Sequence, residues 1–365
     1  MVLSIMNHAK QTLNYSIHTI ELRRCIPLQA LGEWNSKLHT LAAQQKERTY
    51  PNNGNKQIFY PYIHQGVIIS LCTAQTCGYI KLTINLNSLL YRSTQRVALF
   101  YPIDEHIAVL DFNLRHILQA ASLGPPEAFT FSRVDFSVNT RVQHPLTYIQ
   151  LASKTGVPRG YTQTYRRFDN PNRKKKINYR YSYDLTRNDG DGSVTLYSKA
   201  HQLNDEQYAS EMDREQAIGL LRFEVKCQTR QLKKILGTEQ TTILSYHPQL
   251  LKTFLDNAPA ILKTTICDLF PAGDYYHLPE AQRIIREQVP SPRNAERLCA
   301  WVSLASELQS ASLAKQQIFQ PLSCSQRETL IRLQQQTGVN PVTLGRRQPH
   351  ARLPGMRAVF GAVIE

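Results

Sequence analysis

Residues 193–199 read SVTLYSK, a run in which polar and apolar side chains alternate. An extended strand would put Thr195, Tyr197 and Lys199 on one face and two aliphatic side chains on the other. The run therefore predicts a β-strand whose polar face carries a phenol, with an amine two residues further on.

Two other segments show the same alternation. Residues 131–138 read FSRVDFSV, and the motif LLRFEVK follows further along the chain. In each, an arginine and an acid share the face opposite the apolar side chains: Arg133 with Asp135, and Arg222 with Glu224. Pairing the three strands would gather a tyrosine, a lysine, two arginines and two carboxylates on one face. The same pattern is also typical of any antiparallel sheet with one solvated face.

The composition favours a polyanionic partner. The chain has 365 residues, enough for two domains or one large one, and its hydrophobic content of 42% allows a real core. The net charge is +15 and the isoelectric point is near 9.5. Such an excess suits DNA, RNA or an anionic membrane, or else a solvated basic surface with no dedicated partner.

The sequence gives no sign of a membrane or an export signal. No apolar run approaches the roughly 18 residues that a spanning helix needs, and residues 1–16 lack a secretory apolar region. We expect a cytoplasmic protein with no membrane partner. The seven cysteines are scattered and odd in number, so we expect reduced thiols rather than a zinc site.

Cations and aromatic rings are interleaved between residues 158 and 187. Cations neutralise phosphates and aromatic rings stack on exposed bases, so the segment predicts a nucleic-acid groove. A plain solvated hairpin is the alternative. The residues that we expect to contact DNA here are Arg166, Arg167, Arg173, Lys174, Lys175, Lys176, Tyr179 and Tyr181.

Strand patterns dominate the chain up to Gly237, and helical patterns dominate after it. Besides the three segments above, strands are expected at 16–24, 58–63, 66–72 and 79–85, with a further one at 106–111. Helices are expected before Gly237 at 112–122, 144–155, 204–218 and 228–236. Beyond it they are expected at 241–255, 258–269, 279–288, 294–309 and 326–337.

These patterns predict an α+β fold. A largely antiparallel sheet with packed helices would form a catalytic domain over residues 1–240, and a mainly helical domain would follow over 241–365. Residues 326–346 could form a helix-turn-helix if Pro341 opens a second helix, although ordinary helix packing explains the pattern better.

Three segments together resemble the gene II replication initiators of filamentous phages, which are similar to a larger group of rolling-circle plasmid Rep proteins. They are FSRVDFSV at 131–138, TLYSKAHQL at 195–203 and GLLRFEVKCQTRQL at 219–232, in the family's order and near its spacing. The third is the most specific. The resemblance covers roughly residues 75 to 237 and also suggests two related sheet-plus-helix halves.

The resemblance implies an activity and a site. Family members nick one strand of a duplex origin, leave a free 3′-OH and later rejoin the displaced strand. For this chain, the resemblance implies that Tyr197 is the nucleophile and that Asp135 and Glu224 hold Mg²⁺ or Mn²⁺. Where the family often has a glutamate, this chain has Gln202, whose carbonyl brings no charge. The metal site would then be weaker, or would draw on another acid such as Asp205.

Elementary chemistry assigns roles to the remaining residues. A tyrosine hydroxyl titrates near pH 10, and a nearby cation such as Lys199 favours the phenolate. Arg133 and Arg222 could clamp flanking phosphates or simply pair with the two acids. The expected partners are the duplex origin, the displaced single strand and, by resemblance, a helicase and polymerase of a bacterial host. The rival interpretations are a non-catalytic origin-binding or repressor protein and an RNA-binding protein.

Overall fold

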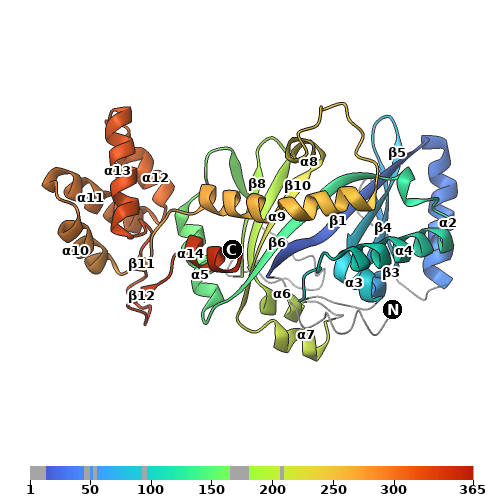
Figure 1. Ribbon diagram of the computed structural model, residues 1–365, viewed down its shortest axis with the longest axis horizontal. Coiled ribbons are helices and arrows are strands. Elements are labelled where there is room, and N and C mark those ends of the chain that lie inside the picture. The colour runs from blue at the N-terminus through green and yellow to red at the C-terminus, as the bar shows by residue number, and fades with distance from the viewer. Residues whose placement is uncertain are drawn as a thin grey trace. The chain divides into compact units, whose positions relative to one another are not determined.

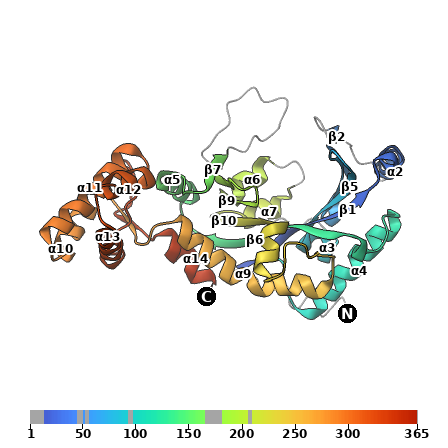
Figure 2. The same cartoon turned by 90° about the horizontal axis from the view of Figure 1, so that it is seen from above.

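The computed structural model describes residues 14–44, 50–51, 56–92, 97–164, 181–205 and 209–364 (Figures 1 and 2). The fold is α+β, with a large antiparallel sheet and many helices, as the sequence predicts. Among the residues described, no helix is both long enough and apolar enough to cross a membrane.

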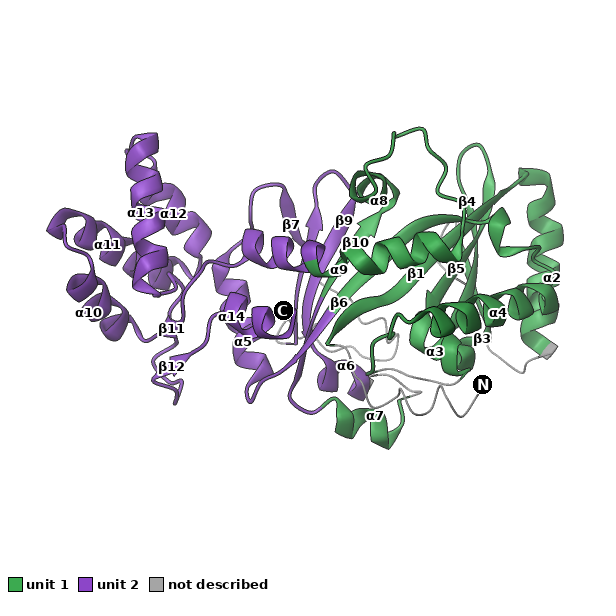
Figure 3. Cartoon of the chain, in the orientation of Figure 1, with its two compact units in different colours: residues 1–137, 206–217, 224–259 green, residues 138–205, 218–223, 260–365 purple. Residues whose placement is uncertain are grey.

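The chain divides into two compact units, coloured separately in Figure 3. Unit 1 comprises residues 1–137, 206–217 and 224–259, and unit 2 comprises 138–205, 218–223 and 260–365. Two strands, β6 (Thr130–Arg141) and β10 (Leu220–Gln228), contribute residues to both units. The units therefore interleave along the sequence, and the domain boundary expected after residue 240 stays a prediction.

The sheet of unit 1 has the strand order β2-β3-β4-β5-β1-β6-β10. The strands other than β6 and β10 are β1 (Tyr15–Ile26), β2 (Tyr50–Pro51), β3 (Lys56–Tyr62), β4 (Val67–Thr73) and β5 (Gly78–Asn85). The strands predicted over 16–24, 58–63, 66–72 and 79–85 are thereby confirmed. They are rich in β-branched and aromatic residues, which fit a pleated and half-buried surface.

The antiparallel register of β1 and β5 explains how this sheet has one apolar and one polar face. Leu22 lies opposite Leu82, and both side chains are fully buried. Between such pairs, Glu21 lies opposite Thr83 on the other face. Because side chains alternate along a strand, the aliphatic residues form the core and the polar ones gather on the opposite face.

Helices cover the apolar side of unit 1. They are α2 (Leu31–Gln44), α3 (Leu86–Tyr91), α4 (Asp104–Ala120) and the first half of α9 (Pro248–Leu269), with α7 (Glu211–Gln216) and α8 (Thr229–Ile235) elsewhere in the unit. Figure 2 shows α3, α4 and α9 together on one side of the strands. Lys252 of α9 donates to Asp104 at the start of α4. Phe254 of α9 packs edge-on against Phe131 of β6, with the two ring centres 5.3 Å apart.

The sheet of unit 2 has the order β6-β10-β9-β8-β7. Its remaining strands are β7 (Tyr161–Thr164), β8 (Ser182–Arg187) and β9 (Gly192–Ser198). Tyr183 pairs with Leu196, whereas Ser182 pairs with Tyr197 in the alternate position. The predicted alternation of the Tyr197 strand is therefore confirmed, with apolar pairs on one face and polar pairs on the other.

The helices of unit 2 are α5 (Pro145–Thr155), α6 (Lys199–Asp205), the second half of α9, α10 (Leu278–Gln288), α11 (Pro292–Leu308), α12 (Ala311–Phe319), α13 (Cys324–Thr337) and α14 (Met356–Ile364). Unit 2 also contains two short strands, β11 (Tyr275–Tyr276) and β12 (Arg352–Leu353), which pair with each other in antiparallel fashion. The mainly helical character predicted beyond residue 240 is confirmed. Phe223 of β10 packs against Phe270 and Phe360, which anchors α9 and α14 on the apolar side.

Several expected elements are wrong in type or extent. Residues 106–111, expected as a strand, belong to α4, because Ile107, Leu110 and Leu114 follow helical spacing and are buried. The helices expected at 241–255 and 258–269 are one continuous helix that contains Pro259. Residues 339–351, where Pro341 was expected to open a second helix, are not helical, so the helix-turn-helix expected at 326–346 is not formed.

Gly156 ends α5 with φ +86° and ψ −179°, a conformation open almost only to glycine. A Cβ there would overlap Ser310 Oγ and come within 2.9 Å of Ser312 Cβ. We expect Gly156→Ala to lower the free energy of unfolding by about 2–4 kcal/mol, measured by chemical denaturation. Gly160 has the same φ of +86° but open space around it, so Gly160→Ala should cost only about 1 kcal/mol. Equal losses would show that the close approach to α12 contributes nothing.

Candidate functional site

A buried ionic cluster lies on the polar face of unit 1. Arg133 Nε donates to Asp135 Oδ1 at 2.7 Å, and Arg133 Nη2 donates to Asp135 Oδ2 at 3.1 Å. The same guanidinium reaches Glu21 Oε1 through Nη1 at 2.7 Å. One arginine therefore holds two carboxylates, in a bidentate manner with Asp135. Of the two roles open to Arg133, this arrangement favours ion pairing over phosphate binding.

Glu21 ties the cluster to β5. Its Oε1 accepts hydrogen bonds from Lys81 Nζ at 3.0 Å and Thr83 Oγ1 at 3.2 Å, besides the one from Arg133. Burial acts to raise the pKa of Glu21, but the attraction of Arg133 and Lys81 outweighs it and holds that pKa below its usual value. Glu21 therefore remains a carboxylate in this setting.

Asp135 and Glu224 belong to the neighbouring strands β6 and β10, and they are 3% and 5% exposed. Burial raises the pKa of Asp135, and the attraction of Arg133 and Lys226 offsets this only in part. The Glu224 carboxylate raises the pKa of Asp135 further, because the two negative charges repel each other. A divalent cation bound between the two carboxylates would relieve the repulsion that Asp135 experiences from Glu224.

Tyr197 lies near the end of β9 in unit 2 and is only 4% exposed. Ser182 is its cross-strand neighbour, and the next pair on this face is Asp184 with Thr195. The predicted polar face is present but buried rather than open to solvent: Asp184 is 6% and Thr195 2% exposed. A phosphodiester could therefore reach the Tyr197 hydroxyl only after this face is uncovered.

Lys199 is the first residue of α6 and not part of the strand. Its Nζ nevertheless lies 6.0 Å from the centre of the Tyr197 ring, and it donates to Gln202 Oε1 at 2.9 Å. The helical turn therefore achieves the proximity that was expected from strand alternation. Gln202, at the position where the resembling family often has a glutamate, is here a hydrogen-bond partner of the lysine.

Tyr181 stacks on a protein ring. Its ring lies 4.3 Å from that of His201 at an interplanar angle of 19°, and His201 Nδ1 lies 2.9 Å from Ser198 Oγ. The backbone N–H of Ser198 also donates to the Tyr181 carbonyl at 3.2 Å. These contacts fix Ser198, the residue directly after Tyr197. His201 therefore has a structural role in this arrangement.

Arg222 is fully buried in unit 2, and its Nε donates to Asn139 Oδ1 at 2.7 Å. This hydrogen bond joins the guanidinium to a neutral amide. A guanidinium enclosed in this way is unable to clamp a phosphate without a large rearrangement, so its predicted contact with DNA has no support in this arrangement.

Much of the predicted basic and aromatic segment lies outside the described residues. So does the side chain of Asp205, the alternative acid for the metal. The DNA contacts expected there stay predictions, and they concern Arg166, Arg167, Arg173, Lys174, Lys175, Lys176 and Tyr179.

The donor set for a metal consists of two carboxylates. Within the ranges that the structure describes, no group of three or more His, Cys, Asp or Glu side chains is placed to hold a metal ion. Mg²⁺ often uses only one or two carboxylates and keeps several waters, so Asp135 and Glu224 fit this ion. Arg133 would have to release at least one oxygen of Asp135.

Sequence reasoning missed Glu21 and Asp184. Glu21 lies in a segment that reads SIHTIELRR. It is two residues from both Thr19 and Arg23, so the three side chains would share the polar face of a strand. That signal was visible, but only the register against β5 and the contact with Arg133 place it in the cluster. Asp184 follows Ser182, whose hydroxyl donates to it at 2.6 Å, on the strand paired with Tyr197.

Comparison with solved structures gives a coarse likeness in fold. A solved structure of a rolling-circle replication initiator protein from Geobacillus stearothermophilus is similar to this chain at a TM-score of 0.33 and 10% sequence identity. The similarity covers 70% of this chain and 85% of that one. No family model and no curated protein matches the sequence. The function assigned to this chain therefore depends on its own residues.

Proposed function

We propose that this protein is a rolling-circle DNA replication initiator that nicks and rejoins one origin strand by tyrosine transesterification. The observation that carries the proposal is Tyr197, in the family's nucleophile motif, with the Lys199 amine 6.0 Å from its ring. The buried pair Asp135 and Glu224, in the family's two acidic motifs, supports it. The resemblance of these three segments supplies the substrate class.

In the proposed reaction the Tyr197 oxygen forms a bond to phosphorus and the bond from phosphorus to the 3′ oxygen breaks. The phenol loses its proton, and the departing oxygen gains one to become a free 3′-OH. Lys199 would favour the phenolate through its positive charge. The phosphotyrosine bond conserves the energy of the broken phosphodiester, so the reverse attack reseals the strand without ATP.

Asp135 and Glu224 would hold Mg²⁺ or Mn²⁺, and that ion would polarise a phosphate oxygen and offset the charge that develops there. Arg133 would then have a positioning role, because it fixes the Asp135 carboxylate and links it to Glu21. Origin duplex and displaced single strand are the proposed DNA partners. A host helicase and polymerase would act on the free 3′-OH and the opened duplex.

Metal binding can be measured separately from activity. We expect the wild-type protein to bind Mn²⁺, with Asp135→Asn and Glu224→Gln each weakening binding by at least about tenfold. Free Mn²⁺ would be measured by electron paramagnetic resonance in the absence of DNA. Asp256→Asn, an exposed acid on α9, is the matched control for a lost charge and should bind normally. Equal affinities in all variants, or full nicking in EDTA, would remove the metal from the proposal.

The burial of Tyr197 favours one rival, a non-catalytic origin-binding protein on the same scaffold. That protein would need the basic surfaces but not the phenol. A protein–DNA adduct that survives SDS separates the two interpretations, because only the enzyme forms a covalent bond to DNA.

A further inference from the structure

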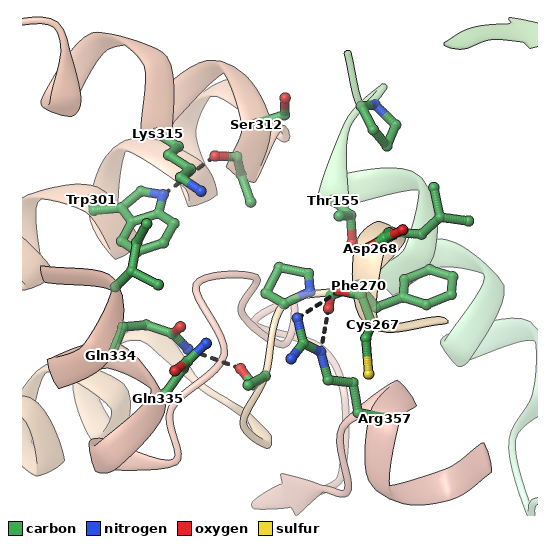
Figure 4. Close-up of a pocket in the computed structure, with 16 residues that line it drawn as sticks. Thr155, Cys267, Asp268, Phe270, Trp301, Ser312, Lys315, Gln334, Gln335 and Arg357 are labelled. Carbon is green, nitrogen blue, oxygen red and sulfur yellow. Dashed lines mark hydrogen bonds between the residues drawn. The ribbon is translucent and has the colours of Figure 1, made fainter. Parts of the chain in front are cut away.

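Two adjoining hollows in unit 2 lie beside α12, and neither is used by the proposed chemistry. The larger is a groove of about 890 Å³ that Val157, Arg159 and residues of α12 and α13 line. The smaller is a pocket of about 400 Å³ between the end of α9, α11, α12, α13 and α14 (Figure 4). Ser312, Lys315 and Ile331 line both, so the groove and the pocket are neighbours that share one wall.

The groove is cationic. Arg159, Lys315 and Arg327 line it, and none of the described residues on its walls is acidic. Its apolar lining includes Val157 and Leu313, which are 37% and 53% exposed. Exposed apolar side chains among uncompensated cations fit a ligand that carries both negative charge and apolar surface.

Two of the cations, Arg327 and Lys315, are held in position by the fold. Arg327 Nε donates to the Leu322 carbonyl at 2.8 Å and its Nη2 to that of Gln320 at 3.3 Å, which secures the turn between α12 and α13. Lys315 Nζ lies 5.5 Å from the centre of the Phe319 ring. Burial lowers the pKa of Lys315, so a bound anion would restore stabilisation that its ammonium group lacks.

The pocket in Figure 4 has fixed walls with ring and amide surfaces. Trp301 Nε1 donates to the Ala311 carbonyl at 3.3 Å. Arg357 donates to the carbonyls of Phe270 and Cys267 at 2.6 and 2.7 Å, at the end of α9. The indole is 4% exposed and lines the pocket together with polar side chains, and a hollow of this size is large enough to enclose one small planar group.

We propose that the groove and pocket together bind single-stranded DNA, with backbone phosphates on Arg159, Lys315 and Arg327 and one unstacked base in the pocket beside Trp301. This inference rests on the proposed function and adds to it a separate place for the displaced strand. Single strands are bound by cationic grooves in which bases meet aromatic and apolar side chains. A duplex keeps its bases stacked inside and has none to offer the pocket.

The charge of the combined site supports this ligand. Around the two hollows, the described lining carries Arg159, Lys315, Arg327 and Arg357 against a single acid, Asp268. An acidic amphipathic peptide helix shares the negative charge and is the alternative ligand, but it carries no nucleobase for the pocket. Measurements on the groove and on the pocket distinguish the two ligands.

The first experiment measures the affinity of the full-length chain for a fluorescent oligo(dT) by anisotropy, in EDTA so that no nicking occurs. Lys315→Glu should weaken binding by about tenfold, and the salt slope should fall by roughly 0.7 for each phosphate that is no longer neutralised. Arg293→Glu carries the same charge change on the exposed start of α11, away from both hollows. Equal affinities for the two variants would overturn the groove assignment and leave the peptide as its ligand.

The second experiment reports on the pocket itself. The chain has two tryptophans, Trp34 and Trp301, so Trp34→Phe leaves Trp301 as the single reporter. Adding oligo(dT) should quench or shift its emission, and abasic oligonucleotide of the same length should not. Equal responses to the two ligands, or none to either, would overturn the placement of a base in the pocket.

Failure of this inference and failure of the proposed function can be told apart. A normal covalent adduct together with unaltered single-strand affinity in Lys315→Glu would reject the groove alone. Conversely, weakened single-strand binding in Lys315→Glu with no adduct in the wild type would reject the nicking chemistry and retain the groove.

Discussion

Tyr197→Phe is expected to abolish nicking of origin DNA, with a loss of at least about 10³-fold, while affinity for the duplex stays unchanged. The substitution removes only the hydroxyl, which is the atom that would attack phosphorus. Tyr197 is 4% exposed and lies opposite Ser182 of β8, so phenylalanine should preserve the fold. Rates would be measured by conversion of supercoiled origin plasmid to open circles.

Tyr183→Phe is the matched control for this variant. Tyr183 lies on the adjacent strand and is also buried, but its hydroxyl donates to the Gly156 carbonyl at 2.7 Å on the apolar side. Its loss should cost about 1 kcal/mol of stability and leave nicking intact. A Tyr197→Phe protein that nicks as fast as the Tyr183→Phe protein would reject Tyr197 as the nucleophile.

Arg133→Gln is expected to lower the free energy of unfolding by about 3–5 kcal/mol at pH 7. The substitution leaves Glu21 and Asp135 buried without the cation that contacts both. The loss would be measured by urea denaturation at several pH values. Arg23→Gln, an exposed arginine on β1, is the control and should change stability by no more than about 0.5 kcal/mol.

The pH dependence of the Arg133→Gln penalty follows from the two acids. In the wild type the pKa of Glu21 lies below its usual value, so Glu21 adds stability above its unfolded pKa that is lost as the pH falls. The pKa of Asp135 is already raised by burial, and losing Arg133 would raise it further. Both effects make the penalty grow with pH, and it should be smallest near pH 4. A penalty independent of pH would show that packing rather than charge is responsible.

Local patterns predicted the strands of the site because their cause is local. The alternation in 131–138, 193–199 and 220–226 reflects one buried and one polar face, and β6, β9 and β10 follow it. Pro145 and Gly156 likewise set the limits of α5, since one fixes φ at a helix start and the other adopts a positive φ beyond its end. The helix at 106–111 was missed because a short apolar run fits both periods.

The surroundings of the site could not be predicted, because they depend on residues distant in the sequence. Arg133 is hydrogen-bonded to Glu21, which lies 112 residues away in the sequence, and Arg222 is hydrogen-bonded to Asn139, which lies 83 residues away. The burial of Tyr197 likewise depends on what covers the polar face, which alternation does not specify. Lys199 shows the opposite case: the strand ended at Ser198, yet the first turn of α6 still placed the amine near the ring.

The central claim is that Tyr197 becomes covalently joined to DNA, and peptide mapping of the adduct tests it most directly. The protein would be incubated with its own origin DNA and Mn²⁺, denatured in SDS, digested with nuclease and protease, and sequenced by mass spectrometry. The proposed function predicts a nucleotide on Tyr197 and none in Tyr197→Phe. A nucleotide on any other residue, or no adduct when open circles do form, would contradict it.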